Sequence, residues 1–475
     1  MSGLREECGV FGVYSKERYA IARTVYYGLF SLQHRGQESC GIVVNDDGVL
    51  SGYKDIGIVN DVFTNEVLDR QSDGKMAIGH VRYGTTGTSD RLNAQPIMVN
   101  HIKGSMALAH NGNLINSHEL RSELELQGSI FQTTSDTEVI AYLITKERIK
   151  ANSIEDAINF AMHRIKGAYS LVIMSPTKLI AARDEQGFRP LCYGIKEDGT
   201  YIVASESCAL DSVSAKFVRD IEPGEIVVFD SEGVRTIRDH CNKKEKALCI
   251  FEYIYFARPD SVLDGVSVHA ARVRAGRCLA QDYPVEADVV VGVPDSGLDA
   301  AIGYSMESGI PYGIGFIKNK YIGRTFIAPS QKAREDRVRI KLNVVKETIK
   351  GKRVILVDDS IVRGTTCARI VSLLKEAGAK EVHMRVSAPP FLNPCYYGTD
   401  IDSRENLIAV NHEIEEIREM TDVESLGYMK IDRLPELLGD KKVMGFCNAC
   451  FSGNYPTKTP VKVDKYKFEK RISER

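Results

Sequence analysis

The sequence lacks the long apolar run that a membrane-spanning helix requires, since nowhere do about eighteen apolar residues follow one another. It also lacks an excess of charge, because 62 Lys and Arg residues face 64 Asp and Glu residues, for a net charge of −2. That balance gives no support to nucleic-acid binding. The segment after Met1 is charged rather than apolar, unlike a secretory signal peptide. We therefore expect no nucleic-acid partner and no membrane partner.

Eleven cysteines are present instead. We expect the chain to be cytoplasmic, and that compartment keeps thiols reduced, so a disulfide framework is not expected. Metal, cluster or nucleophile roles for a few of the cysteines become the alternatives. A length of 475 residues is too great for one hydrophobic core and favours two or three domains.

The two halves of the chain differ in their pattern of expected elements. In the first half, helices are expected at 21–33 and 136–148, and short strands at 9–13, 40–44, 76–80, 106–110, 170–174 and 178–182. This mixture indicates an α+β layered domain, followed by a charged linker at 238–246. In the second half, strands are expected at 287–291, 354–357 and 382–386. Strand, turn and helix repeat there, which indicates a parallel α/β sheet with its site at the carboxyl ends of the strands.

Cys8 stands directly before a short apolar strand. If residues 1–7 were removed, the free α-amino group, with a pKa of about 7.7, could take the thiol proton within the same residue. Taken alone, Cys8 fits a buried strand position better, because cysteine is among the most buried residue types.

The segment 354–366 has the most specific pattern in the chain. A four-residue apolar strand ends in Asp358 and Asp359, and small and hydroxyl residues then lead into a helix. The carboxylates suit sugar hydroxyls or Mg²⁺, and the helix N-terminus suits a phosphate. An ordinary solvated strand end is the alternative.

This pattern resembles the type I phosphoribosyltransferases, which bind phosphoribosyl pyrophosphate (PRPP). The resemblance implies that Ser296, in the turn 292–297, holds Mg²⁺ together with the acidic pair. It also implies that the 5′-phosphate is cradled by Ser360, Arg363, Gly364, Thr365 and Thr366. The basic segment between the two loops, which includes Lys320 and Arg324, is expected to close over the pyrophosphate. A solvated charged helix is the alternative for that segment.

Three polar positions follow strands in the first half. Arg82 could clamp a substrate carboxylate, and Asn111 with Gly112 could form an oxyanion hole. Asp136 could accept from a substrate ammonium or could cap a helix. Together with Cys8 and the segment 33–38, these residues resemble the class II glutamine amidotransferases, whose fold is an N-terminal-nucleophile αββα sandwich.

From about Glu6 to Thr457 the chain thus resembles the glutamine phosphoribosylpyrophosphate amidotransferase family. The resemblance implies a propeptide at 1–7, a glutaminase domain at 8–240 and a phosphoribosyltransferase domain with a C-terminal extension at 241–475. The implied reaction converts PRPP, glutamine and water to 5-phosphoribosylamine, glutamate and pyrophosphate, the first committed step of de novo purine synthesis. Internal transfer of ammonia, a tetramer and feedback inhibition by purine nucleotides are further implications.

Cys447 and Cys450 form a CxxC pair, which alone could be a zinc half-site, a redox pair or neither. One branch of the family carries a propeptide and a [4Fe–4S] cluster on four cysteines. The resemblance to that branch implies Cys249 and Cys395 as the other two ligands. Zinc also accepts four cysteines. The cysteines at 40, 192, 208, 241, 278 and 367 are expected to be packing residues.

Two other functions fit parts of the pattern. A phosphoribosyltransferase for bases with an appended domain would not need the glutaminase residues. A non-catalytic, PRPP-responsive regulatory protein would be expected to lose Cys8 or one of the paired aspartates, and both features are present.

Overall fold

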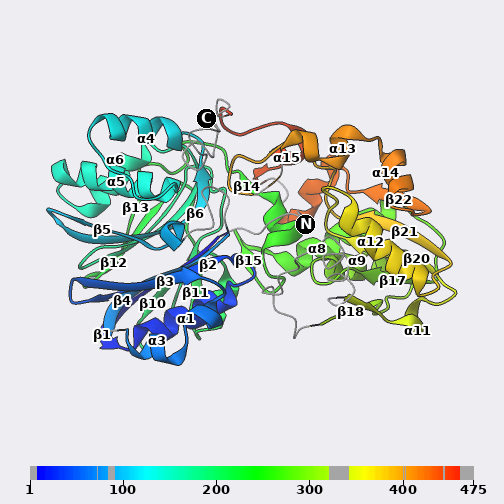
Figure 1. Ribbon diagram of the computed structural model, residues 1–475, viewed down its shortest axis with the longest axis horizontal. Helices are drawn as coiled ribbons and strands as arrows, with labels where there is room; N and C mark the ends of the chain where they lie inside the picture. Colours follow the sequence, from blue (N-terminus) through cyan, green and yellow to red (C-terminus); the bar gives the residue numbers. More distant parts are fainter. Residues whose placement is uncertain are drawn as a thin grey trace, which may run out of the picture.

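The computed structural model describes residues 8–71, 73–83, 91–319, 342–399, 401, 403–441 and 444–459. The expected propeptide at 1–7, Lys320, Arg324 and residues 460–475 lie outside these ranges. In Figure 1 the first half of the chain, blue to green, and the second half, green to red, form two parts side by side. No described helix combines the length and the hydropathy needed to cross a membrane.

Two antiparallel sheets lie face to face in the first half (Figure 1). The first, in the order β11-β9-β10-β1-β4-β2-β3, consists of β1 (Gly9–Tyr19), β2 (Ser39–Asp46), β3 (Val49–Ile56), β4 (Gly74–Arg82), β9 (Cys192–Ile195), β10 (Tyr201–Ala204) and β11 (Lys216–Asp220). The second, in the order β13-β12-β8-β7-β6-β5, consists of β5 (Ile97–His101), β6 (Gly104–Leu114), β7 (Gly167–Met174), β8 (Leu179–Arg183), β12 (Ile226–Asp230) and β13 (Gly233–Ile237). Val10 and Ile78 of the first sheet share a buried cluster with Ala109 and Val172 of the second. Apolar side chains of both inner faces therefore fill the space between the sheets.

Helices cover the outer faces of both sheets. The first sheet packs against α1 (Ile21–Ser31), α2 (Val59–Val62), α3 (Asn65–Asp69) and α7 (Ser207–Asp211). The second packs against α4 (Ser117–Leu126), α5 (Asp136–Lys150) and α6 (Ile154–Met162), and the short η1 (Arg91–Asn93) precedes β5. The expected αββα sandwich is confirmed.

The second half contains a four-stranded parallel sheet in the order β17 (Val289–Gly292), β20 (Arg353–Asp358), β21 (Glu381–Val386) and β22 (Ser425–Tyr428). One face packs against α8 (Val268–Asp282) and α9 (Gly297–Ser308). The other packs against α11 (Lys346–Ile349), α12 (Thr365–Glu376), α13 (Ile408–Asn411) and α14 (Ile414–Met420). The expected parallel α/β sheet is therefore confirmed, and its strands are buried on both faces, as such sheets require.

Shorter elements connect the two halves and complete the second. They are β14 (Leu248–Cys249), the π-helical η2 (Glu252–Phe256), β15 (Val262–Leu263), β16 (Val266–Ser267), β18 (Phe316–Lys318), β19 (Leu342–Val344), η3 (Arg404–Asn406), η4 (Ile431–Lys441), β23 (Phe446–Cys447) and α15 (Ala449–Ser452). Strands β14 and β23 pair in parallel, with Cys249 opposite Cys447. Segments almost two hundred positions apart are thereby held side by side.

Candidate active sites

Cys8 and Arg82 lie at the same end of the first sheet. Cys8 directly precedes β1, and β1 pairs with β4 so that Gly9 lies opposite Val81. The Cys8 thiol is buried, with its Sγ 3.5 Å from the main-chain oxygen of Tyr83, the residue after Arg82. The sheet register thus brings together two residues that the sequence analysis had assigned to one site.

His80 joins the first sheet to the second at this end. Its Nε2 lies 3.0 Å from the main-chain oxygen of His110 in β6. Burial lowers the pKa of His80 to about 3, so the imidazole is neutral and donates to that oxygen. This contact brings Asn111 and Gly112, the next residues of β6, close to the strand that ends at Arg82.

Asn111 and Gly112 have the features expected of an oxyanion hole. The Asn111 side chain is buried, and among the described residues its Nδ2 has no hydrogen-bond partner. A buried donor without an acceptor is costly, by about 1–3 kcal/mol, so a ligand oxygen is the natural partner. Gly112 has a φ of +142°, and a Cβ there would lie 2.2 Å from the main-chain oxygen of Ala168. Only glycine fits this backbone.

Arg82 and Asp136 are both buried. Arg82 Nη1 lies 3.3 Å from Glu38 Oε1. The capping alternative for Asp136 is wrong, because Ser135 is the N-cap of α5 and its Oγ accepts from the Thr137 N–H at 3.2 Å.

The Asp136 carboxylate is instead directed toward β6. It accepts from the Leu114 N–H at 2.9 Å and lies 3.6 Å from His110 Nδ1. Burial alone would raise the pKa of Asp136, but His110 and these hydrogen bonds outweigh it and lower the pKa. A charged carboxylate therefore lies beside the strand that carries Asn111.

The paired aspartates lie where two parallel strands end. Gly292 of β17 lies opposite Val357 of β20, so the turn containing Ser296 adjoins Asp358 and Asp359. The hydroxyls of Ser296 and Ser360 each donate to the Asp359 carboxylate. Among the described residues neither aspartate forms an ion pair within 4.0 Å, although both are buried.

Both aspartates have raised pKa values. Burial is the largest cause for each, and the neighbouring Asp359 charge raises the pKa of Asp358 further. A bound cation would offset this uncompensated negative charge.

The segment after the aspartates presents polar groups at a helix N-terminus. Gly364 has a φ of +79° and directly precedes α12. The side chains of Arg363, Thr365 and Thr366 are exposed around it. Unpaired N–H groups and the helix dipole make such an end suited to an anion. Lys320 and Arg324, the expected lid residues, lie outside the described residues.

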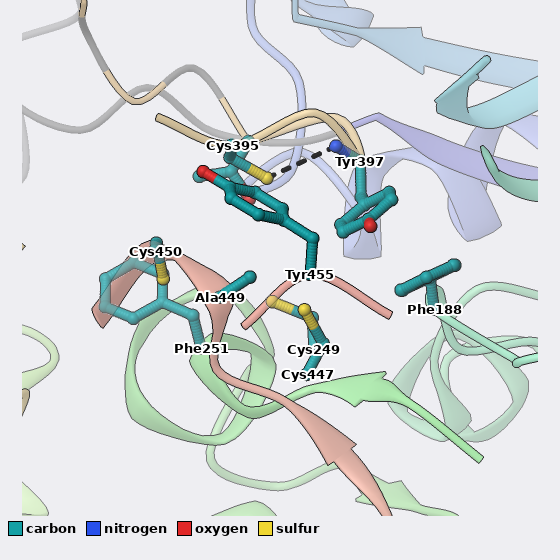
Figure 2. Close-up of a pocket in the computed structure, with 10 residues that line it drawn as sticks. Phe188, Cys249, Phe251, Cys395, Tyr397, Cys447, Ala449, Cys450 and Tyr455 are labelled. Atoms are coloured by element: carbon teal, nitrogen blue, oxygen red, sulfur yellow. Dashed lines mark hydrogen bonds between the residues drawn. The ribbon is translucent and has the colours of Figure 1, made fainter. Parts of the chain in front are cut away.

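The four cysteines predicted as cluster ligands line one small cavity (Figure 2). They reach it from β14 (Cys249), the loop before Tyr397 (Cys395), β23 (Cys447) and α15 (Cys450). The other lining residues are mostly aromatic: Phe188, Phe251, Tyr397 and Tyr455, together with Thr399 and Ala449. Burial raises the pKa of Cys447 to about 12 and raises that of Cys450 as well, so both are neutral thiols unless a cation binds them.

Within the described ranges no three Cys, His, Asp or Glu side chains are grouped closely enough to hold a metal ion. A single zinc ion bound by four cysteines would lie about 2.3 Å from each sulfur, which requires the four sulfurs to be close together. The four thiols instead surround the cavity from several sides (Figure 2).

Sequence reasoning missed a buried ionic network beside the first site. Arg35, Arg189, Glu206 and Glu252 are each buried, and they form ion pairs with one another. Arg35 had been included only within the segment 33–38, without a role of its own. One sequence feature could have revealed this network: a glutamate, Glu252, lies inside the apolar run 250–256. A fully buried carboxylate almost always has a charged partner.

Comparison with known proteins gives matches to both halves and to the whole chain. A glutamine amidotransferase domain model matches residues 82–212, and a phosphoribosyl transferase domain model matches residues 268–410. The amidophosphoribosyltransferase of Methanocaldococcus jannaschii is 50% identical over 464 residues, which cover 95% of this chain and 98% of the relative. That of Bacillus subtilis is 50% identical over 461 residues, covering 96% and 95%. The solved structure of the PRPP amidotransferase from B. subtilis complexed with ADP and GMP has a TM-score of 0.88 and 49% identity, covering 95% of this chain and 98% of the other.

Proposed function

We propose, from the premise that this chain belongs to the amidophosphoribosyltransferase family, that Cys8 and the pair Asp358 and Asp359 carry the chemistry of its two active sites. The enzyme transfers nitrogen from glutamine to PRPP in purine biosynthesis. PRPP, glutamine and water give 5-phosphoribosylamine, glutamate and pyrophosphate. The proposed division is a propeptide at 1–7, a glutaminase domain at 8–240 and a phosphoribosyltransferase domain with its extension at 241–475.

Cys8 is the proposed nucleophile of the glutaminase half. Removal of residues 1–7 frees its α-amino group, which takes the thiol proton. The thiolate attacks the amide carbon of glutamine, the C–N bond breaks and ammonia leaves with that proton. Water then hydrolyses the thioester to glutamate and restores the thiol.

Asn111 and Gly112 are the proposed oxyanion hole. The observation that carries this assignment is the buried Asn111 Nδ2, which has no acceptor among the described residues. The Gly112 N–H is the proposed second donor, because its backbone excludes any side chain that would block the approach of substrate.

Arg82 and Asp136 are proposed to bind the carboxylate and the ammonium of glutamine. Their support is position and charge, because both are buried near the strands that carry Cys8 and Asn111. A guanidinium pairs with a carboxylate bidentately, which would orient the substrate amide toward the thiol.

Mg²⁺ fits the phosphoribosyl site, because this ion is usually bound by one or two carboxylates together with substrate phosphates. Asp358, Asp359 and Ser296 would hold it, and when bound it would neutralise charge on the pyrophosphate. The proposed cradle for the 5′-phosphate is formed by Ser360, Arg363, Gly364, Thr365 and Thr366. Lys320 and Arg324 are proposed to cover the pyrophosphate.

Ammonia is proposed to pass from the glutaminase half to the ribose without meeting water. Water would protonate it and remove its nucleophilicity. The ammonia nitrogen then bonds to ribose C1 as the bond to pyrophosphate breaks, and the new amine loses a proton.

A [4Fe–4S] cluster is the proposed occupant of the cavity lined by Cys249, Cys395, Cys447 and Cys450. Four cysteines around an apolar cavity suit an iron–sulfur cluster. We propose that its role is structural, because it would join β14 to β23 and α15 while the reaction requires no electron transfer. A zinc site remains the alternative, and metal analysis of anaerobically purified protein distinguishes the two.

Purine nucleotides are the proposed feedback inhibitors, since a nucleotide carries the ribose 5-phosphate that the PRPP site would accept. The B. subtilis relative was solved with ADP and GMP bound.

We also propose a homotetramer and a cytoplasmic location, the latter because none of the eleven cysteines, all within the described residues, forms a disulfide.

A glutaminase assay with and without PRPP tests the proposed assignment. Glutamate release should require Cys8 and should increase when PRPP binds the second half, because ordering of the basic segment would couple the two domains. A rate that PRPP leaves unchanged would refute the coupling.

Intact-mass measurement of active protein tests the propeptide, and an active chain that retains residues 1–7 would rule it out.

A further inference from the structure

Glu252 belongs to the second half of the chain, yet its carboxylate lies between two guanidinium groups of the first. Arg35 donates to both of its oxygens, at 2.9 Å and 2.8 Å. Arg189 Nη1 lies 3.4 Å from Glu252 Oε1. All three side chains are fully buried, so each charge depends on the others for compensation.

Arg35 connects Glu252 to the proposed nucleophile. Its Nε donates to the main-chain oxygen of Cys8 at 2.9 Å, and its Nη1 also pairs with Glu206 at 2.6 Å. The rigid plane of the guanidinium therefore fixes the Cys8 carbonyl relative to two carboxylates. Any change in the orientation of Arg35 changes the backbone from which the thiol projects.

Arg189 connects Glu252 to the back of the proposed oxyanion hole. Its Nε and Nη2 donate to the main-chain oxygen of Tyr397, at 3.1 Å and 2.7 Å, and Nη2 reaches Thr399 Oγ1 at 3.3 Å. A Cβ on Gly398 would lie 3.3 Å from the carbonyl carbon of Gly112, so this loop packs against the oxyanion strand.

The same loop is also tied to the residue after Gly112. Asn113 Nδ2 donates to the main-chain oxygen of Tyr396 at 2.9 Å. The loop 396–399, held by Arg189, therefore supports the backbone of the proposed oxyanion hole from behind.

Glu252 is itself firmly held. It begins the π-helical η2, whose region is anchored by Arg272 of α8. Arg272 Nε donates to the Tyr253 carbonyl at 2.9 Å, and its Nη2 donates to the carbonyls of Tyr255 at 2.9 Å and Ala257 at 2.7 Å. Such helices are rare and occur frequently at functional sites.

We propose that Glu252, contributed by the phosphoribosyltransferase half, is a positioning residue of the glutaminase site. Through Arg35 it fixes the main chain of Cys8, and through Arg189 it fixes the loop that supports Gly112. One carboxylate thereby sets the separation of nucleophile and oxyanion hole. The inference rests on the proposed roles of Cys8, Asn111 and Gly112.

A second ion pair between the halves offers a matched control. Arg183 of β8 binds Asp264 bidentately, at 2.9 Å and 3.0 Å, and Asp264 lies between β15 and β16. Arg183 Nε donates to the main-chain oxygen of Arg189 at 2.8 Å, a contact that does not involve the Arg189 guanidinium. Among the hydrogen bonds that the described residues form, none joins Arg183 or Asp264 to Cys8 or to loop 396–399. Asp264 has a φ of +45°, which asparagine tolerates, so D264N removes the charge with little backbone strain.

The test compares E252Q with D264N in the full-length enzyme. In E252Q we expect kcat for glutamine-dependent glutamate release to fall about 10- to 100-fold, with KM for glutamine changed less than about threefold, because small misplacements of reacting groups have effects of that size. Ammonia-dependent synthesis should fall no further than in D264N. The conservative E252D should recover part of kcat.

Equal losses of kcat in E252Q and D264N, or a loss of ammonia-dependent synthesis as large as the loss of glutamate release, would overturn the inference. If E252Q does not fold, T399V replaces it, since valine removes the hydroxyl that lies 3.3 Å from Arg189 Nη2. The iron content of T399V is measured alongside, because Thr399 also lines the cysteine cavity. A kcat of T399V lowered about two- to fivefold relative to D264N is then expected, and equality with D264N overturns the inference. C8S is the reference: full glutamine-dependent activity in C8S would refute the proposed nucleophile itself.

Discussion

Buried carboxylates in and beside the two proposed active sites have pKa values that are shifted in opposite directions. In the glutaminase half, Asp136 and Glu206 have lowered pKa values, because nearby cationic or hydrogen-bonding groups outweigh the effect of burial. Asp358 and Asp359 are equally buried, yet their pKa values are raised. Negative charge is compensated within the first site and only partly compensated in the second.

This difference indicates how each site becomes active. Protein groups organise the proposed glutaminase site, where His80 joins the two sheets and Arg35 holds the main chain of Cys8. In the phosphoribosyl site, Ser296, Ser360 and Arg272 offset the charge of Asp359 only in part, so its pKa stays raised. This is expected for a site that binds Mg²⁺ with a phosphorylated substrate. Removing groups from the first site should therefore impair chemistry, whereas removing charge from the second should also alter stability.

The largest expected effect is that of C8S on the first site. Glutamine-dependent synthesis should fall by about 10⁴-fold or more, because loss of a nucleophile removes the covalent step. Ammonia-dependent synthesis should persist, since the second site is separate. Product formation from each nitrogen donor is the measurement, and a loss of both activities would show that the sites are not separable.

The double variant D358N/D359N tests the phosphoribosyl site. Synthesis from ammonia and from glutamine should both fall, by roughly 10²- to 10⁴-fold, because a hard cation with its phosphate ligands loses two oxygen partners. Turnover from ammonia is measured at saturating PRPP and Mg²⁺. Normal turnover would contradict the assignment of these aspartates.

The cysteine cavity should affect stability more than chemistry. Anaerobically purified enzyme should be brown, with about four iron and four sulfide per chain. C447S should lose iron and unfold at a lower temperature, whereas C367S, at a buried cysteine outside the cavity, should keep its iron. Full iron content in C447S would remove Cys447 from the ligand set, and zinc without visible absorption would exclude the cluster.

The smallest expected effect is on pH-dependent stability without Mg²⁺ or PRPP. The folded-state pKa of Asp358 lies above its unfolded value, so the folded state keeps a proton that the unfolded state has lost. The free energy of unfolding therefore falls as the pH rises from the unfolded-state pKa of Asp358 to its folded-state pKa. D358N/D359N should unfold at a higher temperature than the parent at pH 8, by roughly 2–4 °C, the shift that about 1 kcal/mol produces.

That advantage should narrow as the pH falls toward 4, because the parent aspartates are then protonated in the folded state and about half protonated in the unfolded state. Thermal unfolding in chelator at several pH values tests this. A double variant less stable than the parent at pH 8 would show that the aspartates are compensated by the protein after all. Addition of Mg²⁺ and PRPP should stabilise only the parent.

Much of the fold was predictable because its central strands are continuous apolar runs. The ends of β4, β20 and β21 lie within about two residues of their expected positions, and β1 begins where expected but continues to Tyr19. Strand β3 was missed, since Val49–Ile56 mixes polar residues with a glycine and lies at a sheet edge. The short β22 was missed for a similar reason, because Ser425–Tyr428 contains one strongly apolar side chain.

The site residues divide in the same way. The position of Asp358 at the end of a strand, and of the following loop before a helix, was predictable because that pattern is contiguous. The roles of these residues stay predictions. The contact of Glu252 was not predictable, because its partner Arg35 lies 217 positions away and nothing in either local sequence specifies the other. Long-range ionic contacts are set by the packing of the two halves, which local patterns do not describe.

The most direct test of the central contrast is glutamate release by D358N/D359N, measured without and with PRPP. If protein groups organise the glutaminase site, D358N/D359N should release glutamate without PRPP as fast as the parent does. The increase that PRPP causes in the parent should disappear in the variant. A large fall in the rate without PRPP would contradict the account, because it would show that the glutaminase site depends on the charges of the second site even when no ligand is present.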